Sequence, residues 1–201
     1  MQPKLLAMLA ITVVAVSSTG AFAFVDNETQ ASANGVTDGP TILGHIEVTV
    51  MDETGNIKEY RQTDNLVVTE GLKAFSERLF EANLWTLNSG EFKNIGVGTG
   101  TTGAAAENTD LETQQGGKQL GTVSQDGTVG AKIEFAYPAS GSGSLQNSTG
   151  TVAITEAILS DSIANATGNL FARQTFTAVN VGQSDSLTIS WTITPADSDS
   201  S

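Results

Sequence analysis

Apolar and polar residues alternate along a series of short segments from Thr41 to Thr194, and this alternation constrains the fold more than any other feature. Ile46, Val48 and Val50 occupy alternate positions, which is the period of a β-strand with one buried face. Turns rich in Gly, Asn and Asp separate the segments. The expected strands are 41–50, 57–63, 94–100, 120–124, 131–137, 152–159, 170–179 and 186–194. Seven or eight strands predict a mainly β fold, an antiparallel β-sandwich or a jelly-roll-like barrel.

One segment has the period of a helix instead. The sequence predicts an α-helix over about residues 69–81, with Thr69 as its cap. Val68, Leu72, Phe75 and Leu79 form a stripe at three-and-four spacing. A single short helix beside a sheet depends on burial of its apolar face for stability. We therefore expect this stripe to pack into the core.

Composition excludes several classes of function. The chain has 201 residues, enough for one domain with a sizeable core. Its net charge of −13, from 9 basic and 22 acidic residues, argues against nucleic acid as a partner. Cysteine is absent and there is one histidine, which excludes thiol chemistry and leaves little material for a Ser-His-Asp triad. We expect no catalytic activity.

The N-terminus has the three parts of a secretory signal. A basic start at Lys4 precedes an apolar run over residues 5–16, and Ala21-Phe22-Ala23 fits the small-residue cleavage pattern. The predicted organisation is a signal peptide (1–23), a flexible leader (24–40), a β-sandwich domain (41–195) and a disordered acidic tail (196–201). An uncleaved membrane anchor is the alternative, but polar residues interrupt the apolar run before the length of a bilayer span. Cleavage leaves no membrane span and places the protein outside the cell or at its surface.

Exported chains are also candidates for glycosylation. Three Asn-x-Ser/Thr sequons give possible acceptor sites at Asn27, Asn147 and Asn165.

Two other patterns suggest ligands. The glycine-rich segment 95–100 resembles a phosphate loop, but no helix-opening pattern follows it and a Walker lysine is missing, so close packing or a bend in a strand is the preferred interpretation. Acidic turns around Asp52, Asn56 and Asp110 supply hard oxygen atoms, and calcium is the cofactor they would suit. Neither turn has the spacing of an EF-hand loop.

Aromatic residues are few. Trp85, Tyr60 and Tyr137 are the candidates for a ligand platform, such as the one a carbohydrate-binding module would use. Trp191 alternates with Ile189 and Ile193, so we expect it in the core.

Several short sequence segments resemble segments of small structural proteins of tailed viruses, of the tail-fibre or baseplate class. They occur in the same order and together span roughly residues 66–195: VVTEGL at 67–72, IGVGTGTT at 95–102, DLE at 110–112, LFARQTF at 170–176 and DSLTISWTI at 185–193. The resemblance implies an antiparallel β module used for assembly without catalysis. The signal peptide departs from that pattern and suggests a cellular surface protein built on a similar module.

The leading hypothesis is an exported, non-catalytic structural protein, a subunit of a surface filament, sheath or matrix. Its partners would be copies of itself or other surface proteins, contacted through sheet edges or the leader. The alternatives are a secreted adhesion or carbohydrate-binding module and a structural protein of a virion tail.

Overall fold

The computed structural model describes residues 41–80, 84–85, 87, 89–145, 150–164 and 168–196. The description that follows concerns the unit Thr37–Ser201. The predicted signal peptide, the leader, residues 197–201 and the sequons at Asn27, Asn147 and Asn165 lie outside the described residues.

The described strands form two antiparallel sheets of five strands each. The first sheet comprises β1 (Thr41–Met51), β2 (Ile57–Asp64), β6 (Thr122–Asp126), β7 (Gly130–Tyr137) and β10 (Ser186–Ala196), in the order β2-β1-β10-β7-β6. The second comprises β3 (Leu66–Val67), β4 (Asn94–Gly98), β5 (Gln114–Leu120), β8 (Val152–Ser160) and β9 (Leu170–Val181), in the order β3-β9-β8-β4-β5. This confirms the β-sandwich, and two sheets of this order favour it over the closed barrel.

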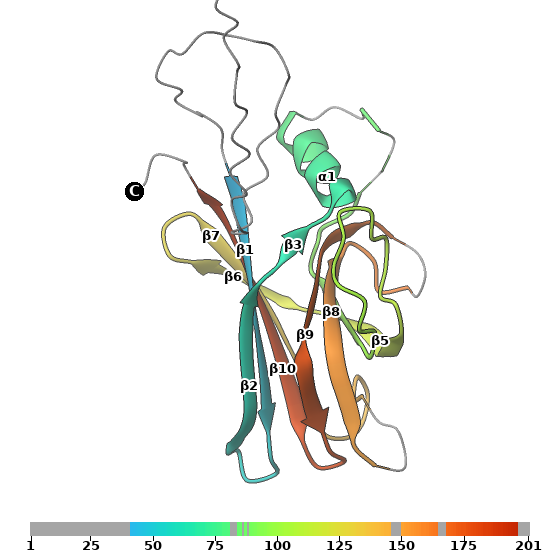
Figure 1. Cartoon of the computed structure of the whole chain (residues 1–201). Helices are drawn as coiled ribbons and strands as arrows, with labels where there is room; N and C mark the ends of the chain where they lie inside the picture. The colour runs from blue at the N-terminus through green and yellow to red at the C-terminus, as the bar shows by residue number, and fades with distance from the viewer. Residues whose placement is uncertain are drawn as a thin grey trace, which may run out of the picture. The chain divides into compact units, whose positions relative to one another are not determined.

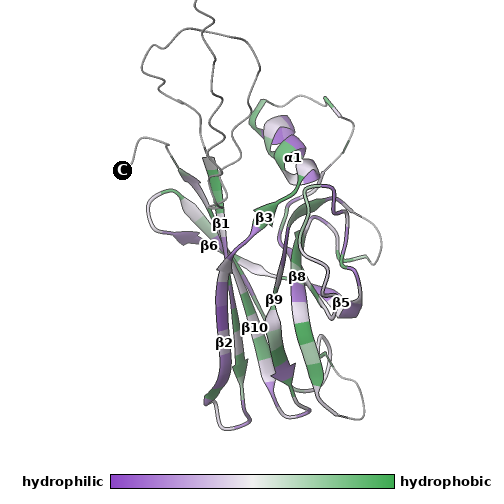
Figure 2. Ribbon diagram, in the orientation of Figure 1, coloured by the Kyte–Doolittle hydropathy of each residue, from purple (hydrophilic) through white to green (hydrophobic). Residues whose placement is uncertain are grey.

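The predicted alternation places one face of each strand in a shared core. Ile46 of β1 lies opposite Trp191 of β10, and Val48 lies opposite Ile189, and all four are buried. The same core cluster includes Ile154 of β8 and other residues of the second sheet. Trp191 is thus a core residue, as its alternation with isoleucines predicted. Figure 2 shows β2, at the edge of the first sheet, as largely hydrophilic.

The helix α1 (Thr69–Phe80) forms where the sequence predicted it, directly after β3 (Figure 1). It packs against β9 through a different face from the one expected. Its buried residues are Gly71, Ala74 and Glu77. A Cβ atom at position 71 would overlap the backbone carbonyl of Phe171, so glycine lets the helix lie directly on the strand.

The apolar stripe of α1 faces outward. Val68, which precedes the helix, is buried, but Leu72, Phe75 and Leu79 are 41%, 37% and 60% exposed. The expectation that the whole stripe packs into the core is therefore wrong. Spacing identifies an apolar face, but the small residues at 71 and 74 decide which face can approach the sheet closely.

Two strands were missed, and several strand boundaries differ from the predicted ones by one or two residues: β4 ends at Gly98, and β6 runs from Thr122 to Asp126. β3 has only two residues, too few for a period. β5 reads QQGGKQL and carries one apolar residue, so it has no alternation to detect. β10 continues to Ala196, one residue past the predicted end of the domain, because Thr41 of β1 pairs with it.

Candidate functional site

The glycine-rich segment of β4 provides space for a carboxylate. β8 lies between β4 and β9, and Gly98 of β4 is paired with Glu156 of β8. A Cβ atom at Gly98 or Gly100 would overlap the Glu156 carboxylate. The glycines therefore serve close packing, which is the interpretation the sequence favoured over a phosphate loop.

Glu156 is fully buried and accepts hydrogen bonds from three backbone amides. Its Oε1 accepts from the amides of Gly100 and Thr113, both at 2.9 Å, and its Oε2 accepts from the amide of Glu112 at 3.1 Å. The three amides belong to the two ends of the loop that joins β4 to β5, residues 99–113. One carboxylate thus holds both ends of this loop together.

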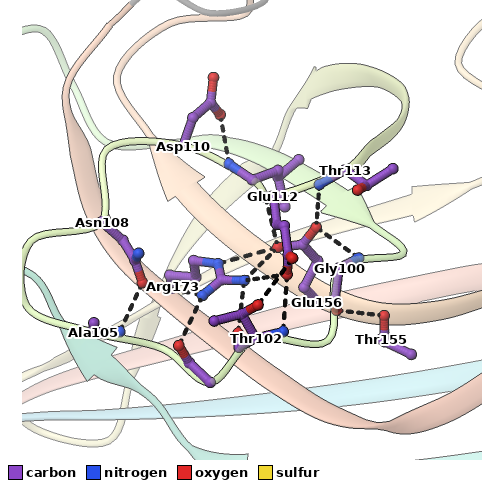
Figure 3. Close-up of polar contacts among 12 residues, drawn as sticks. Gly100, Thr102, Ala105, Asn108, Asp110, Glu112, Thr113, Thr155, Glu156 and Arg173 are labelled. Atoms are coloured by element: carbon purple, nitrogen blue, oxygen red, sulfur yellow. Dashed lines mark hydrogen bonds and ion pairs between the residues drawn. The ribbon is translucent and has the colours of Figure 1, made fainter.

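Arg173 of β9 completes the cluster, with a side chain only 2% exposed. Its Nε and Nη2 donate to Glu156 Oε2 at 3.1 and 2.8 Å. Nη1 donates to Asn108 Oδ1 and to the carbonyl of Gly103, and Nη2 donates to the carbonyl of Thr102 (Figure 3). All five N–H groups of a guanidinium are used in this way.

The cluster is built to hold a loop. Every donor of Arg173 is used inside the chain, so binding an external anion there would break contacts to the loop. Glu112 lies at the rim, where its Oε2 and Oε1 accept from the amide and hydroxyl of Thr102, and these bonds lower the pKa of Glu112. Sequence reasoning missed both Glu156 and Arg173. The available clue was a charged residue at a core-facing position in each of two apolar strands.

The acidic candidates for calcium lie in two separate places. Asp52 is in the turn between β1 and β2, where its Oδ1 accepts from the amides of Thr54 and Asn56, both at 2.9 Å. The hydrogen bond from the Thr54 hydroxyl, together with those from the two amides, lowers the pKa of Asp52 to about 2. Asp110, in the loop held by Glu156, instead pairs with the buried Lys118 at 3.1 Å. In the described part of the chain, no three His, Asp or Glu side chains gather where they would hold a metal ion.

The three aromatic candidates do not form one exposed surface. Tyr137 is 1% exposed, and its hydroxyl donates to the carbonyl of Ile95 at 2.8 Å. Burial raises the pKa of this phenol. Tyr60 lies on β2, and its hydroxyl donates to Glu47 at 3.0 Å, whereas Trp85 follows α1. The expectation of a platform that includes Tyr137 is wrong, because its side chain fills the core from the end of β7.

The most unusual surface of the described chain lies on and after α1. Its exposed apolar side chains, here called the α1 apolar face, are Leu72, Phe75, Leu79 and Phe80, and the exposed Leu84 and Trp85 follow them in the chain. Sequence analysis found the residues but assigned them to the core. They are the strongest candidate for a functional surface, since exposed groups of large apolar side chains on soluble proteins mark sites of interaction.

Comparisons with protein-family models, with curated proteins and with solved structures found no match for this chain. None of the helices within the described ranges is long and apolar enough to cross a membrane.

Proposed function

We propose that this protein is an exported, non-catalytic structural subunit that assembles with copies of itself into a surface filament, sheath or matrix. The observation that carries the proposal is the α1 apolar face. Phe75 and Leu79 are exposed, whereas the small residues Gly71 and Ala74 are buried where the same helix packs against β9. Exposure of large apolar side chains costs free energy of about 25 cal/mol per Å², which association would recover.

Three further features support this role. The signal-like N-terminus fits export. The buried polar residues Glu156 and Arg173 are used to stabilise a loop, as expected of a rigid building block. β6 lies at the edge of the first sheet with all five of its residues exposed, which is a second surface suited to contacts between subunits.

The alternative of a carbohydrate-binding module has less support, because Tyr137 is buried and only Tyr60 and Trp85 of the three candidate rings are exposed. A structural role in a virion tail would need the same assembly property but no export signal.

The test is light scattering coupled to size exclusion on the protein isolated after export, at low and high concentration. The wild-type protein should form concentration-dependent oligomers, and the double variant Phe75→Ser/Leu79→Ser should remain monomeric. The control is Ile57→Ser/Val129→Ser, which removes two exposed apolar side chains elsewhere and should assemble like the wild type. A monomeric wild type at every concentration would refute the proposal. Mass spectrometry of the same sample tests cleavage after Ala23.

A further inference from the structure

The α1 apolar face is bordered by positive charge. At 3.6 residues per turn, the face extends over an arc of about 140° from Phe75 to Phe80, with Arg78 about 60° beyond Phe75 and Lys73 about 20° beyond Phe80. The helix therefore presents an apolar strip between two cations.

These two cations stand apart from the other basic residues of the described chain. The others each have a carboxylate within 4 Å, namely Lys58, Arg61, Lys93, Lys118, Lys132 and Arg173. Neither Lys73 nor Arg78 has a carboxylate of a described residue within 4 Å, although Arg78 donates to the carbonyl of Ser89 and its charge helps to lower the pKa of Glu91. In a chain with a net charge of −13, basic residues with no carboxylate within 4 Å mark a surface that suits an acidic partner.

The leader, residues 24–40, has the complementary chemistry. It begins with Phe24 and Val25, followed closely by Asp26 and Glu28, and it contains no Lys or Arg. The other terminal segment outside the described residues, 197–201, is acidic but reads DSDSS and has no apolar side chain. Only the leader therefore matches both the apolar strip and its charged borders.

The leader is also long enough to reach such a site. It joins the sandwich at Thr41, where β1 starts, and the nearby Gly44 accepts a hydrogen bond from Asn65, which precedes β3 and α1. The 17 residues of the leader span at most roughly 60 Å when extended. That length permits contact with α1 of an adjacent copy.

We infer that the start of the leader, residues 24–28, docks on the α1 apolar face of a neighbouring copy, with Asp26 and Glu28 opposite Lys73 and Arg78. The choice of a neighbouring copy rests on the proposed function. The contact is head-to-tail, because the leader of one copy binds a different surface, the α1 apolar face, on the next copy. Such contacts extend into open polymers unless they close into a ring.

A mixing experiment tests the inference directly. Phe24→Ser removes the docking residue of the leader and leaves α1 intact, and Phe75→Ser does the reverse. Each variant alone should be monomeric at concentrations where the wild type assembles, and an equimolar mixture should form a heterodimer through its one intact leader and one intact helix. Far-UV circular dichroism and thermal unfolding should match the wild type, since Phe75 is exposed.

A charge swap then tests the border contacts. Lys73→Glu alone and Asp26→Lys alone should each weaken association about tenfold, and the double variant should recover to within about threefold of the wild type.

The outcomes separate this inference from the proposed function. If the wild type assembles and either single variant assembles equally well, docking of the leader on α1 is refuted while assembly stands. Failure of the mixture to associate, with an assembling wild type, refutes docking on a neighbouring copy. A monomeric wild type refutes both.

Discussion

At the scale of single residues, the pair Glu156 and Arg173 matters most. Both side chains are removed from water, and a buried ion pair stabilises a fold only if its remaining hydrogen-bonding groups are satisfied. Here backbone amides of the loop satisfy the carboxylate, and loop carbonyls satisfy the guanidinium. The pair therefore links the loop over residues 99–113 to the centre of the second sheet.

Glu156→Gln should lower the free energy of unfolding by about 3–5 kcal/mol, because it removes the buried counter-ion of Arg173 and leaves only the half-exposed Glu112, 3.9 Å away. Urea denaturation measures the change. The matched control is Glu134→Gln, which removes a half-exposed partner of Lys132 and should cost under about 1 kcal/mol. Equal effects of the two substitutions would show that the buried pair does not stabilise the loop.

Asp52 should make stability depend on pH in the acid range. Its turn lowers the pKa from 3.8 to about 2, so its contribution is present above pH 4 and is lost as the pH falls from about 4 to about 2. Titration of the Asp52 carboxyl carbon by NMR should give a midpoint near 2. A midpoint close to 4 would mean that the turn does not bind the ionised form preferentially. Asp52→Asn should flatten this part of the pH–stability curve.

At the scale of elements, α1 shows how a helix is oriented by its smallest residues. The orientation is set at Gly71, where the helix contacts the backbone of Phe171. Ala74 and the carboxylate of Glu77, which accepts from the amide of Trp85 at 2.6 Å, continue the buried face. The larger apolar residues are left on the outside, where they are available to a partner.

Gly71→Ala should destabilise the protein by about 1–3 kcal/mol, although alanine in place of glycine inside a helix ordinarily stabilises by about 1 kcal/mol. The sign reverses because the new methyl group would overlap the carbonyl of Phe171. Chemical denaturation checks this, with Ser76→Ala on the same helix as a control that should be neutral or slightly stabilising. A stabilising Gly71→Ala would show that α1 does not lie tightly on β9.

At the scale of the whole molecule, the two sheets share one core. The cluster that contains Ile46 and Trp191 of the first sheet also contains Ile95, Ile154 and Val179 of the second. Neither sheet can expose its inner face without exposing that of the other. The sandwich should therefore unfold as a single cooperative unit.

Cooperative unfolding can be checked with two probes in a Trp85→Phe variant. The fluorescence of Trp191 then reports on the core between the sheets, and far-UV circular dichroism reports on the strands. The two denaturation curves should have the same midpoint, within experimental error. Separate midpoints would indicate that one sheet unfolds before the other.

Local pattern alone determined much of this protein. Alternation identified most of the strands and the core position of Trp191, and three-and-four spacing located the helix, because these periods follow from backbone geometry and persist in any context. It also identified the glycines of 95–100 as packing residues. All of these predictions depend only on residues that are close together in the sequence.

Tertiary structure decided the features that depend on residues far apart in the sequence. The salt bridge of Glu156 and Arg173 forms because β8 and β9 are adjacent in the sheet, and it then recruits the loop at 99–113. Tyr137 is buried at the end of β7, and its hydroxyl is satisfied there by the carbonyl of Ile95 in the other sheet. The outward direction of Phe75 depends on the contact of Gly71 with Phe171, 100 residues away in the sequence. Periodicity reports which residues share a face, whereas only packing decides whether that face meets the core or the solvent.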